Sequence, residues 1–395
     1  MTKRSIKDLD ISGKRVLIRV DFNVPIDNGK VTDDTRIRAA LPTIEYARGQ
    51  GATVLLASHL GRPKGKVCDD MTLGPVANHL SSLMGVPVLF ASNCIGGEAK
   101  AALDKAVPGG VVLLENLRFH EEEEKNETGF SKALASLADV YVNDAFGTAH
   151  RAHASTEGII SHVHSAGAGL LVSLELEYLG NLLDKPARPL VAIIGGAKVS
   201  GKLEVIKNLL KSVDTLLIGG AMAYTFFKRR GLPVGQSLVE QNLLKETELI
   251  EELASKHNVR LLLPTDHIVT KTIDAKATHE LLTINDPSIV DRIGVDIGPK
   301  TSSMYADIVQ AAETVVWNGP MGVFEIDVFS KGTLALAKAM AVTTATTIVG
   351  GGDSIAAISK AGVTNEITHI STGGGASLEF LGGRSLPGIA ALPDK

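Results

Sequence analysis

The chain has few cysteines, no apolar run long enough to cross a membrane, and no apolar segment at its start. Cys68 and Cys94 are the only cysteines among 395 residues, which argues against a disulfide-stabilised scaffold. A membrane-spanning helix needs roughly 20 apolar residues in succession, and no run approaches that length. The opening residues MTKRSIKDLD lack the apolar core of a signal peptide. We therefore expect a cytoplasmic protein without a membrane partner.

Long runs of one charge are also scarce. The chain has 40 Lys and Arg against 44 Asp and Glu, a net charge of -4, and no extended basic segment. Nucleic acid is therefore not expected as a partner. The short charged run EEEEK, Glu121–Lys125, is expected to be a solvated surface segment. Glycine, by contrast, is abundant: there are 40, and many follow apolar runs directly, where the backbone must turn tightly or approach a ligand.

Short apolar runs alternate with helical patterns along the whole chain, and continuous apolar runs are typical of strands covered on both faces. In the first half these runs are residues 15–20, 52–58, 86–90, 110–115 and 139–144, with helices expected over 36–48 and 73–84. In the second half they are residues 189–195, 215–220, 260–264, 313–319 and 346–351. Such strand–helix repetition implies right-handed crossovers and a parallel sheet. The fold class we expect is α/β, with two doubly wound, Rossmann-like domains joined by a helix.

The domain boundary is marked by a helical stretch over residues 173–185, followed by the prolines of "PARP", because proline stops a helix. We expect residues 1–180, with the connecting helix at 173–185, to form the N-terminal domain. Residues 186–380 are expected to form the C-terminal domain.

Polar residues after the strands of the first half form a basic set. Parallel sheets bind ligands at the carboxyl ends of their strands, and the residues found there are Asp21, Asn23, Arg36, His59, Arg62, Arg118, His150, Arg151 and His153. Arginine forks match the oxygens of phosphate and carboxylate, so the set predicts a small anion with more than one charged end. Any single arginine is equally well explained by a surface salt bridge. A metal site is disfavoured because no carboxylate or thiol accompanies the histidines at ligand spacing.

The strands of the second half are followed by glycine instead. The glycine segments are Gly195–Gly196, Gly219–Gly220, WNGPMG at 317–322, GGGDS at 350–354 and STGGGAS at 371–377. Backbone N–H groups at helix N-termini bind phosphate oxygens without help from side chains. Asp353 could hold Mg²⁺ through a carboxylate oxygen or could cap the helix that follows it. An anion-binding half and a nucleotide-binding half suit an enzyme that moves a phosphoryl group between a nucleotide and a small acid.

Three other function classes fit less well. The segment GGAKVSGKL at 195–203 resembles a P-loop, but Leu203 stands where a Ser or Thr would hold Mg²⁺, so we reject that class. Lys198 and Lys202 can still present ammonium groups to phosphate from the first turn of a helix. A dinucleotide-binding dehydrogenase would need G-x-G-x-x-G, whereas these glycines are consecutive. A non-catalytic phosphate-binding scaffold would have no need for both an arginine set and a glycine set.

Several motifs resemble the signature of the phosphoglycerate kinase family. They occur in order over nearly the whole chain: RVLIRVDFNVP (15–25), TRI (35–37), SHLGRP (58–63), ENLRF (115–119), NDAFGTAHRAHAS (143–155), GGAKV (195–199), WNGPMGVFE (317–325), GGGDS (350–354) and STGGGASLE (371–379). The resemblance implies phosphoryl transfer from 1,3-bisphosphoglycerate to ADP, giving 3-phosphoglycerate and ATP in glycolysis, with Mg²⁺. It also implies a monomer whose lobes close on an active-site cleft between them, and a tail, residues 381–395, that packs on the N-terminal domain.

The resemblance further assigns roles to residues of this sequence. The phosphoglycerate ligands would be Asp21, Asn23, Arg36, His59, Arg62, Arg118 and Arg151. The nucleotide ligands would be Lys198, Lys202, Gly294, Glu325, Gly351, Gly352, Asp353 and Ser354, with Asp353 at the metal. Arg36, Lys202, Gly373 and Gly374 would act on the migrating phosphoryl group. The chain departs from the family pattern at Leu174, Gly201 and Gly382, which puts helix capping and lobe closure in question more than the chemistry.

Overall fold

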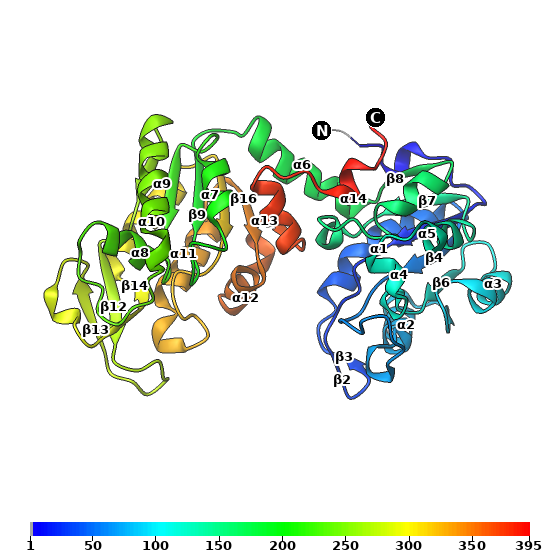
Figure 1. The fold of residues 1–395 in the computed structure, drawn as a ribbon, viewed down its shortest axis with the longest axis horizontal. Helices are drawn as coiled ribbons and strands as arrows, with labels where there is room; N and C mark the ends of the chain where they lie inside the picture. Colours follow the sequence, from blue (N-terminus) through cyan, green and yellow to red (C-terminus); the bar gives the residue numbers. More distant parts are fainter. Residues whose placement is uncertain (1–2) are drawn as a thin grey trace. The chain divides into compact units, whose positions relative to one another are not determined.

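A computed structural model describes residues 3–395, which divide into two compact units. The N-terminal unit contains the residues up to Glu177 together with Ser385–Lys395, and the C-terminal unit contains Tyr178–Arg384. Each unit is built on its own parallel sheet (Figure 1). This confirms the predicted α/β fold class with two parallel-sheet domains.

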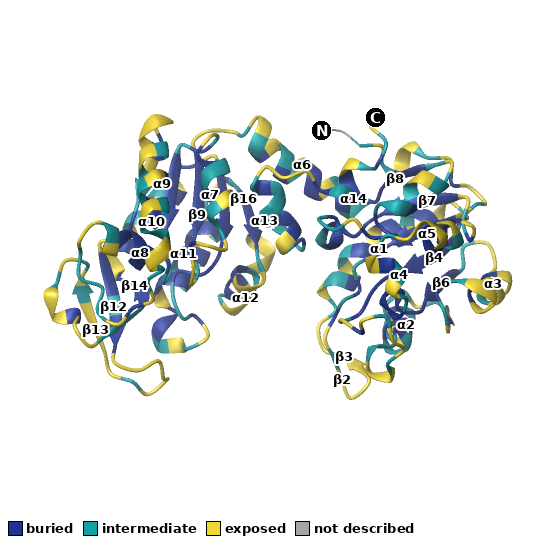
Figure 2. Ribbon diagram, viewed as in Figure 1, coloured by how far each residue is buried: buried dark blue, intermediate teal, exposed yellow. Residues whose placement is uncertain are grey.

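The sheet of the N-terminal unit has six parallel strands in the order β5-β6-β4-β1-β7-β8. Their bounds are β1 Arg15–Arg19, β4 Thr53–Ala57, β5 Val88–Ala91, β6 Val111–Leu114, β7 Val140–Asn143 and β8 Ala166–Ala168. The helices α1 Thr35–Gly49, α2 Gly74–Met84, α3 Gly96–Asp104, α4 Glu121–Glu124 and α5 Thr128–Ala135 complete it. Strands β1, β4 and β6 are buried along almost their whole length (Figure 2), as their continuous apolar sequences predict. A short β-hairpin, β2 Ile26–Asp27 and β3 Lys30–Val31, follows β1.

The sheet of the C-terminal unit also has six parallel strands, in the order β11-β10-β9-β15-β16-β17. Their bounds are β9 Leu190–Ile194, β10 Thr215–Ile218, β11 Arg260–Leu262, β15 Thr314–Asn318, β16 Thr346–Gly350 and β17 His369–Ser371. The helices are α7 Leu203–Leu209, α8 Ala223–Arg229, α9 Leu244–Lys256, α10 Pro299–Gln310, α11 Lys331–Val342, α12 Gly352–Lys360 and α13 Gly375–Leu381. The chain winds outward from β9 in one direction and returns to continue from β15 in the other. The crevice between β9 and β15 is thus the switch point, where such sheets bind ligands.

A smaller antiparallel sheet in the C-terminal unit was not predicted. It has the strand order β13-β12-β14, with β12 Asp266–Thr270, β13 His279–Thr283 and β14 Ile293–Ile297. Strand β13 is mostly exposed (Figure 2), so its sequence HELLT carries neither a continuous apolar run nor a clean alternation. Strand signals depend on burial, and this strand has too little of it to stand out.

Helix α6, Leu170–Asp184, contains residues of both units. It begins three residues before the expected start at 173 because the carboxylate of Asp144 caps it: Asp144 Oδ1 accepts hydrogen bonds from the N–H groups of Leu171 (3.0 Å) and Val172 (3.2 Å). At the other end of the chain, α14 Pro387–Ala390 is followed by residues that contact Lys3 and Arg4. Lys3 Nζ donates to Leu392 O at 2.7 Å, and the N–H of Arg4 donates to Pro393 O at 3.0 Å.

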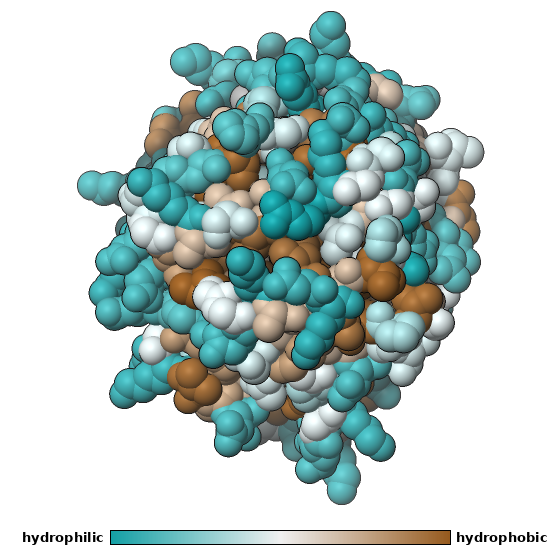
Figure 3. Space-filling view, turned by 90° about the vertical axis from the view of Figure 1, so that its right-hand side faces the viewer, coloured by the Kyte–Doolittle hydropathy of each residue, from teal (hydrophilic) through white to brown (hydrophobic). Residues whose placement is uncertain are grey.

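Figure 3 shows one face on which hydrophilic side chains surround small, scattered hydrophobic areas. Within residues 3–395, no helix has both the length and the apolar character needed to cross a membrane.

Candidate active site

In the N-terminal unit, an arginine and an aspartate meet beyond the carboxyl end of β1. Arg36, near the start of α1, donates from Nη1 to Asp21 Oδ2 at 3.1 Å and to the carbonyl oxygen of Asn23 at 3.2 Å. Asn23 Oδ1 accepts a hydrogen bond from the N–H of Gly61, in the loop after β4, at 2.9 Å. These bonds join the loops that follow two neighbouring strands. They leave the Arg36 side chain 37% exposed, with donors available to a ligand.

His59 lies at the centre of the basic set. It is 4% exposed, and burial lowers the pKa of its imidazole well below the usual value. Arg19 Nη2 lies 3.4 Å from His59 Nδ1, and the positive charges of Arg19, Arg118, Arg36 and Arg151 lower that pKa further. His59 is therefore neutral at pH 7, and the surrounding charge is supplied by the arginines.

Three further arginines of the predicted set differ in their partners. Arg118, in the turn after β6, donates from Nη1 to Gly61 O at 2.8 Å, and its Nε lies 3.2 Å from Glu124 Oε1 in an ion pair without hydrogen-bond geometry. Arg62 is exposed, and Arg151 is half-buried. Among residues 3–395, neither Arg62 nor Arg151 forms an ion pair with a carboxylate; Arg151 donates from Nε to the neighbouring histidine ring. Two positive charges are thus left uncompensated for an anionic ligand.

Two charged residues behind this set were missed from the sequence. Arg19, the last residue of β1, is 1% exposed, and its Nε donates to Ser155 Oγ at 2.8 Å. Glu123 is fully buried and accepts hydrogen bonds from the N–H of Ser155 (2.9 Å) and from its hydroxyl (2.5 Å). The expectation that Glu121–Lys125 is a solvated run is wrong at Glu123, because the short helix α4 turns this one carboxylate inward. Burial raises the pKa of Glu123, while Arg19 opposes that increase.

In the C-terminal unit, glycines allow the loops after β9, β10 and β15 to touch at the switch point. A Cβ on Gly195 would lie 2.2 Å from the carbonyl oxygen of Pro320, and a Cβ on Gly220 would lie 2.5 Å from the backbone nitrogen of Gly196. Any side chain at these positions would force the loops apart. The glycine pairs predicted from the sequence therefore serve first to let backbone segments approach one another.

Lys202 lies at the N-cap of α7, one residue before the helix and not within its first turn as expected. Its Nζ donates to Asn318 O at the end of β15, at 2.8 Å. Burial lowers the pKa of this ammonium group to about 8, although the carboxylate of Asp353 opposes the decrease. Lys198 lies in the loop before the helix and is exposed. Of these two lysines, Lys202 is thus the half-buried cation at the switch point.

The loop after β16 presents Asp353 to solvent. The N-cap of α12 is Gly351, with φ +92°, and Asp353 is an exposed residue of the first turn with no capping bond, so the alternative of an N-cap aspartate is wrong. Gly352 is exposed, whereas Ser354 is buried and its Oγ accepts a hydrogen bond from the N–H of Gly319 at 2.6 Å. The serine hydroxyl therefore acts within the protein, joining the loops after β15 and β16.

The loop after β17 contains Gly373 and Gly374. The N–H of Gly373 donates to Ser371 Oγ at 3.3 Å, and Gly374 has φ +52° directly before α13. Gly373 is buried and Gly374 is half-buried. A left-handed backbone at this point favours glycine.

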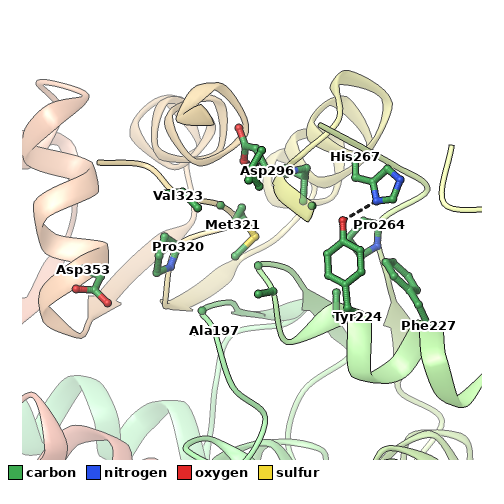
Figure 4. Close-up of a pocket in the computed structure, with 18 of the residues that line it drawn as sticks. Ala197, Tyr224, Phe227, Pro264, His267, Asp296, Pro320, Met321, Val323 and Asp353 are labelled. Atoms are coloured by element: carbon green, nitrogen blue, oxygen red, sulfur yellow. Dashed lines mark hydrogen bonds between the residues drawn. The ribbon is translucent and has the colours of Figure 1, made fainter. Parts of the chain in front are cut away.

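A cavity of about 250 Å³ opens beside the switch point of the C-terminal unit (Figure 4). It is lined by Gly196, Ala197, Gly220, Ala221, Ala223, Tyr224, Phe227, Pro264, His267, Gly294, Val295, Asp296, Ile297, Pro320, Met321, Gly322, Val323, Glu325 and Asp353. Of the predicted nucleotide residues, Gly294, Glu325 and Asp353 line this cavity; Lys198, Lys202, Gly351, Gly352 and Ser354 do not. Its mostly apolar walls suit a flat ring. The carboxylate of Asp353 places a charge at one end of the cavity.

A hydrogen-bonded pair of rings forms the far end of the cavity. Tyr224 Oη lies 2.6 Å from His267 Nδ1 (Figure 4). A Cβ on Gly294 would fall 1.6 Å from that hydroxyl, so the glycine makes room for the tyrosine. Burial lowers the pKa of His267 to about 4, which keeps the ring neutral at pH 7. No sequence pattern indicates this pair, because both residues lie in apolar surroundings.

Comparison with known proteins adds the following similarities. A family model described as "Phosphoglycerate kinase" matches residues 6–384. A protein of Moorella thermoacetica named "Phosphoglycerate kinase" is 56% identical over 396 residues and 100% of each chain. One of Solibacter usitatus with the same name is 57% identical over 397 residues, covering 99% of this chain and 100% of the other. The structure of phosphoglycerate kinase from Coxiella burnetii matches with a TM-score of 0.90 and 44% identity over 98% of both chains. That of Pyrococcus horikoshii matches with a TM-score of 0.85 and 35% identity, over 99% of this chain and 98% of the other.

Proposed function

The chain belongs to the phosphoglycerate kinase family, and we propose that each of its two units binds one substrate of that family's reaction. The protein is a kinase that transfers a phosphoryl group between 1,3-bisphosphoglycerate and ADP, giving 3-phosphoglycerate and ATP in glycolysis. The residues that carry each step are our assignment.

The phosphoglycerate is assigned to the basic set of the N-terminal unit. The observation that carries this assignment is that Arg36 and Arg118 are both bonded to the loops after β1 and β4, where the charges of Arg19, Arg36, Arg118 and Arg151 all act on the ring of His59. A substrate with a carboxylate at one end and a phosphate at the other needs donors at two places, and guanidinium groups bind both bidentately. Arg62 and Arg151, which lack carboxylate partners among residues 3–395, are the side chains a ligand would engage. Asp21 and Asn23 would hold Arg36 in position and accept from the hydroxyl of the acid.

The nucleotide is assigned to the cavity of the C-terminal unit. Its apolar walls would hold the adenine, with Gly294 at one end and Glu325 on its rim. The phosphates would extend toward Asp353 and the loops of Gly351, Gly352, Gly373 and Gly374, where backbone N–H groups precede helices. Lys202 would neutralise the terminal phosphate. Lys198, exposed on the same loop, would attract the phosphates more weakly, because solvent and salt screen its charge.

Mg²⁺ is assigned to Asp353. No group of three or more His, Cys, Asp or Glu within residues 3–395 could hold a metal on its own. That finding fits Mg²⁺, which proteins commonly bind through one or two carboxylates together with substrate phosphates. Asp353 is exposed, makes no capping bond and lies at the cavity. Bound there with the nucleotide, the ion would neutralise phosphate charge.

The catalytic contribution of the protein is electrostatic. Phosphoryl transfer needs no covalent intermediate, because the migrating group carries its charge on three equatorial oxygens and requires mainly positioning and neutralisation. We assign neutralisation on the acyl-phosphate side to Arg36 and on the nucleotide side to Lys202. The amides of Gly373 and Gly374 would donate to the phosphoryl oxygens. A preorganised donor of this kind contributes roughly 3–4 kcal/mol to the transition state.

The assignment of substrates to units is tested by Arg36→Ala, with Arg38→Ala as a matched control on the same helix. Arg38 is 59% exposed, and its one ion pair within residues 3–395 is with Asp34, four residues before it. We expect Arg36→Ala to lower turnover by about 10²-fold or more and to weaken 3-phosphoglycerate binding in calorimetry, with ADP binding unchanged. Arg38→Ala should alter neither. Normal turnover in Arg36→Ala, or a loss of ADP binding in place of the acid, would contradict the assignment.

We also propose that the protein is a cytoplasmic monomer, with the phosphoglycerate-binding residues within 1–180, the nucleotide-binding residues within 186–380 and the tail within 381–395. Light scattering after gel filtration should give a mass close to the 41.5 kDa of one chain. A mass near twice that value would refute the monomer.

A further inference from the structure

The C-terminal unit contains a second cavity, which shares only one lining residue with the cavity assigned to the nucleotide. It measures about 420 Å³ and is bounded by the small antiparallel sheet and by the first turns of α10 and α11. Ile268 and Leu281 stand directly opposite each other in the β12–β13 register and both line it. His267, the residue directly before Ile268 in β12, points to the other face of the sheet, since side chains alternate along a strand, and it lines the nucleotide cavity. The sheet therefore separates two cavities.

The second cavity is apolar inside and basic at its edge. Its apolar lining comes from Ile268, Leu281, Ile297, Val328 and Ala335. Lys331 and His279 also line it, both are exposed, and no carboxylate does. Within residues 3–395, Lys331 forms no ion pair or hydrogen bond through its ammonium group. An apolar interior with an unpaired cation at the edge is complementary to an apolar chain that ends in a negative charge.

The nearby aspartates do not compete for that cation. Asp296 accepts hydrogen bonds from the N–H groups of Gly332 (2.7 Å) and Ile297 (2.9 Å), and is 5% exposed. Asp266, 2% exposed, accepts from the N–H of Thr301 at 2.8 Å. Both carboxylates are engaged within the fold, so the charge of Lys331 is available to a ligand.

We propose that this second cavity binds a medium-chain aliphatic carboxylate, with the chain against Ile268 and Leu281 and the carboxylate at Lys331. The cavity lies within the roughly 300–1,000 Å³ of small-molecule sites. Only Ile297 belongs to the lining of both cavities, so such a ligand and a nucleotide bind together. The binding of a carboxylate here depends on this cavity alone and does not require the substrate assignments above.

Calorimetric titration of the full chain with butanoate, hexanoate and octanoate tests the proposal. Burying each methylene contributes about 0.8 kcal/mol, or roughly a fourfold gain in affinity. Octanoate should therefore bind about 15-fold more tightly than hexanoate, and octylammonium, which places a positive charge beside Lys331, should bind more weakly than octanoate. Saturating ADP should leave octanoate bound.

Two variants locate the site. Ala335→Phe fills the cavity and should abolish octanoate binding, while Leu281→Ser, at a residue that is 52% exposed and so tolerant of change, should weaken it several-fold. Lys331→Gln should weaken it two- to fivefold, as expected for an exposed ion pair. Lys338→Gln, on the same helix but outside the lining, should have no effect and serves as the control. Absence of saturable binding, displacement of octanoate by ADP, or unchanged binding in both Leu281→Ser and Ala335→Phe would overturn the proposal.

Discussion

Replacing Lys202 with Met should make the C-terminal unit more stable and the enzyme nearly inactive. The methionine keeps an unbranched side chain of similar length and removes the ammonium group. Asn318 O, which accepts from Lys202 Nζ, also accepts from the N–H of Gly195 at 3.0 Å. The substitution therefore leaves no buried carbonyl without a partner, and the loop after β15 should hold its conformation.

The expected gain in stability follows from the pKa of the lysine. Burial lowers that pKa from 10.5 to about 8, which corresponds to a cost of about 3 kcal/mol for keeping the ammonium group charged at pH 7. Between pH 8 and 10.5 the unfolded chain binds this proton and the folded chain does not, so the free energy of unfolding rises with pH across that range. Removing the amine should thus raise the free energy of unfolding by about 1–3 kcal/mol at pH 7, and the advantage should disappear toward pH 10.

The measurement uses the single tryptophan of the chain. Trp317 lies in β15 and is fully buried in the C-terminal unit, so its fluorescence during denaturant unfolding reports on that unit alone. Activity of the variant should fall by about 10²-fold or more, since Lys202 is assigned to charge on the migrating group. Lys198→Met, at an exposed position, should change stability little. A variant that is less stable than the parent at pH 7, or one that keeps full turnover, would refute the reasoning.

Three further predictions concern single substitutions. Glu123→Ala should destabilise the N-terminal unit by about 1–3 kcal/mol in denaturant unfolding, because Ser155 would lose both of its hydrogen bonds to Glu123 and the buried Arg19 would lose a nearby opposite charge; a change below about 0.5 kcal/mol would contradict this. Gly319→Ala would place a Cβ 2.2 Å from the Lys202 ammonium at φ +95°, and ADP affinity should fall sharply in calorimetry while phosphoglycerate affinity stays the same. Asp353→Asn should raise the Mg²⁺ concentration needed for half-maximal nucleotide binding at least tenfold, and an unchanged Mg²⁺ dependence would remove Asp353 from the metal site.

The sheets and the glycine turns could be predicted because the burial of a strand determines which residue types its sequence can contain. Strands covered on both faces must be apolar at every position, so β9 and β16 stand out as continuous runs. Their carboxyl ends need polar or glycine residues when a ligand approaches there. This is why Arg118 and Lys202, although in different halves of the chain, could both be predicted as site residues from the sequence.

The buried charged residues behind the site could not be predicted, because their burial depends on the direction in which each side chain points. Glu123 is one of four successive glutamates, and nothing in the sequence separates it from Glu124, which is exposed. Only the placement of α4 against Ser155 makes it a buried counter-ion for Arg19. Arg19 did carry a signal, since a charge at the end of an otherwise apolar strand must find a partner or a ligand. A buried positive charge such as that of Arg19 requires a buried acceptor or a negative charge nearby. A search for that partner among the four successive glutamates would therefore have led to Glu123 or one of its neighbours.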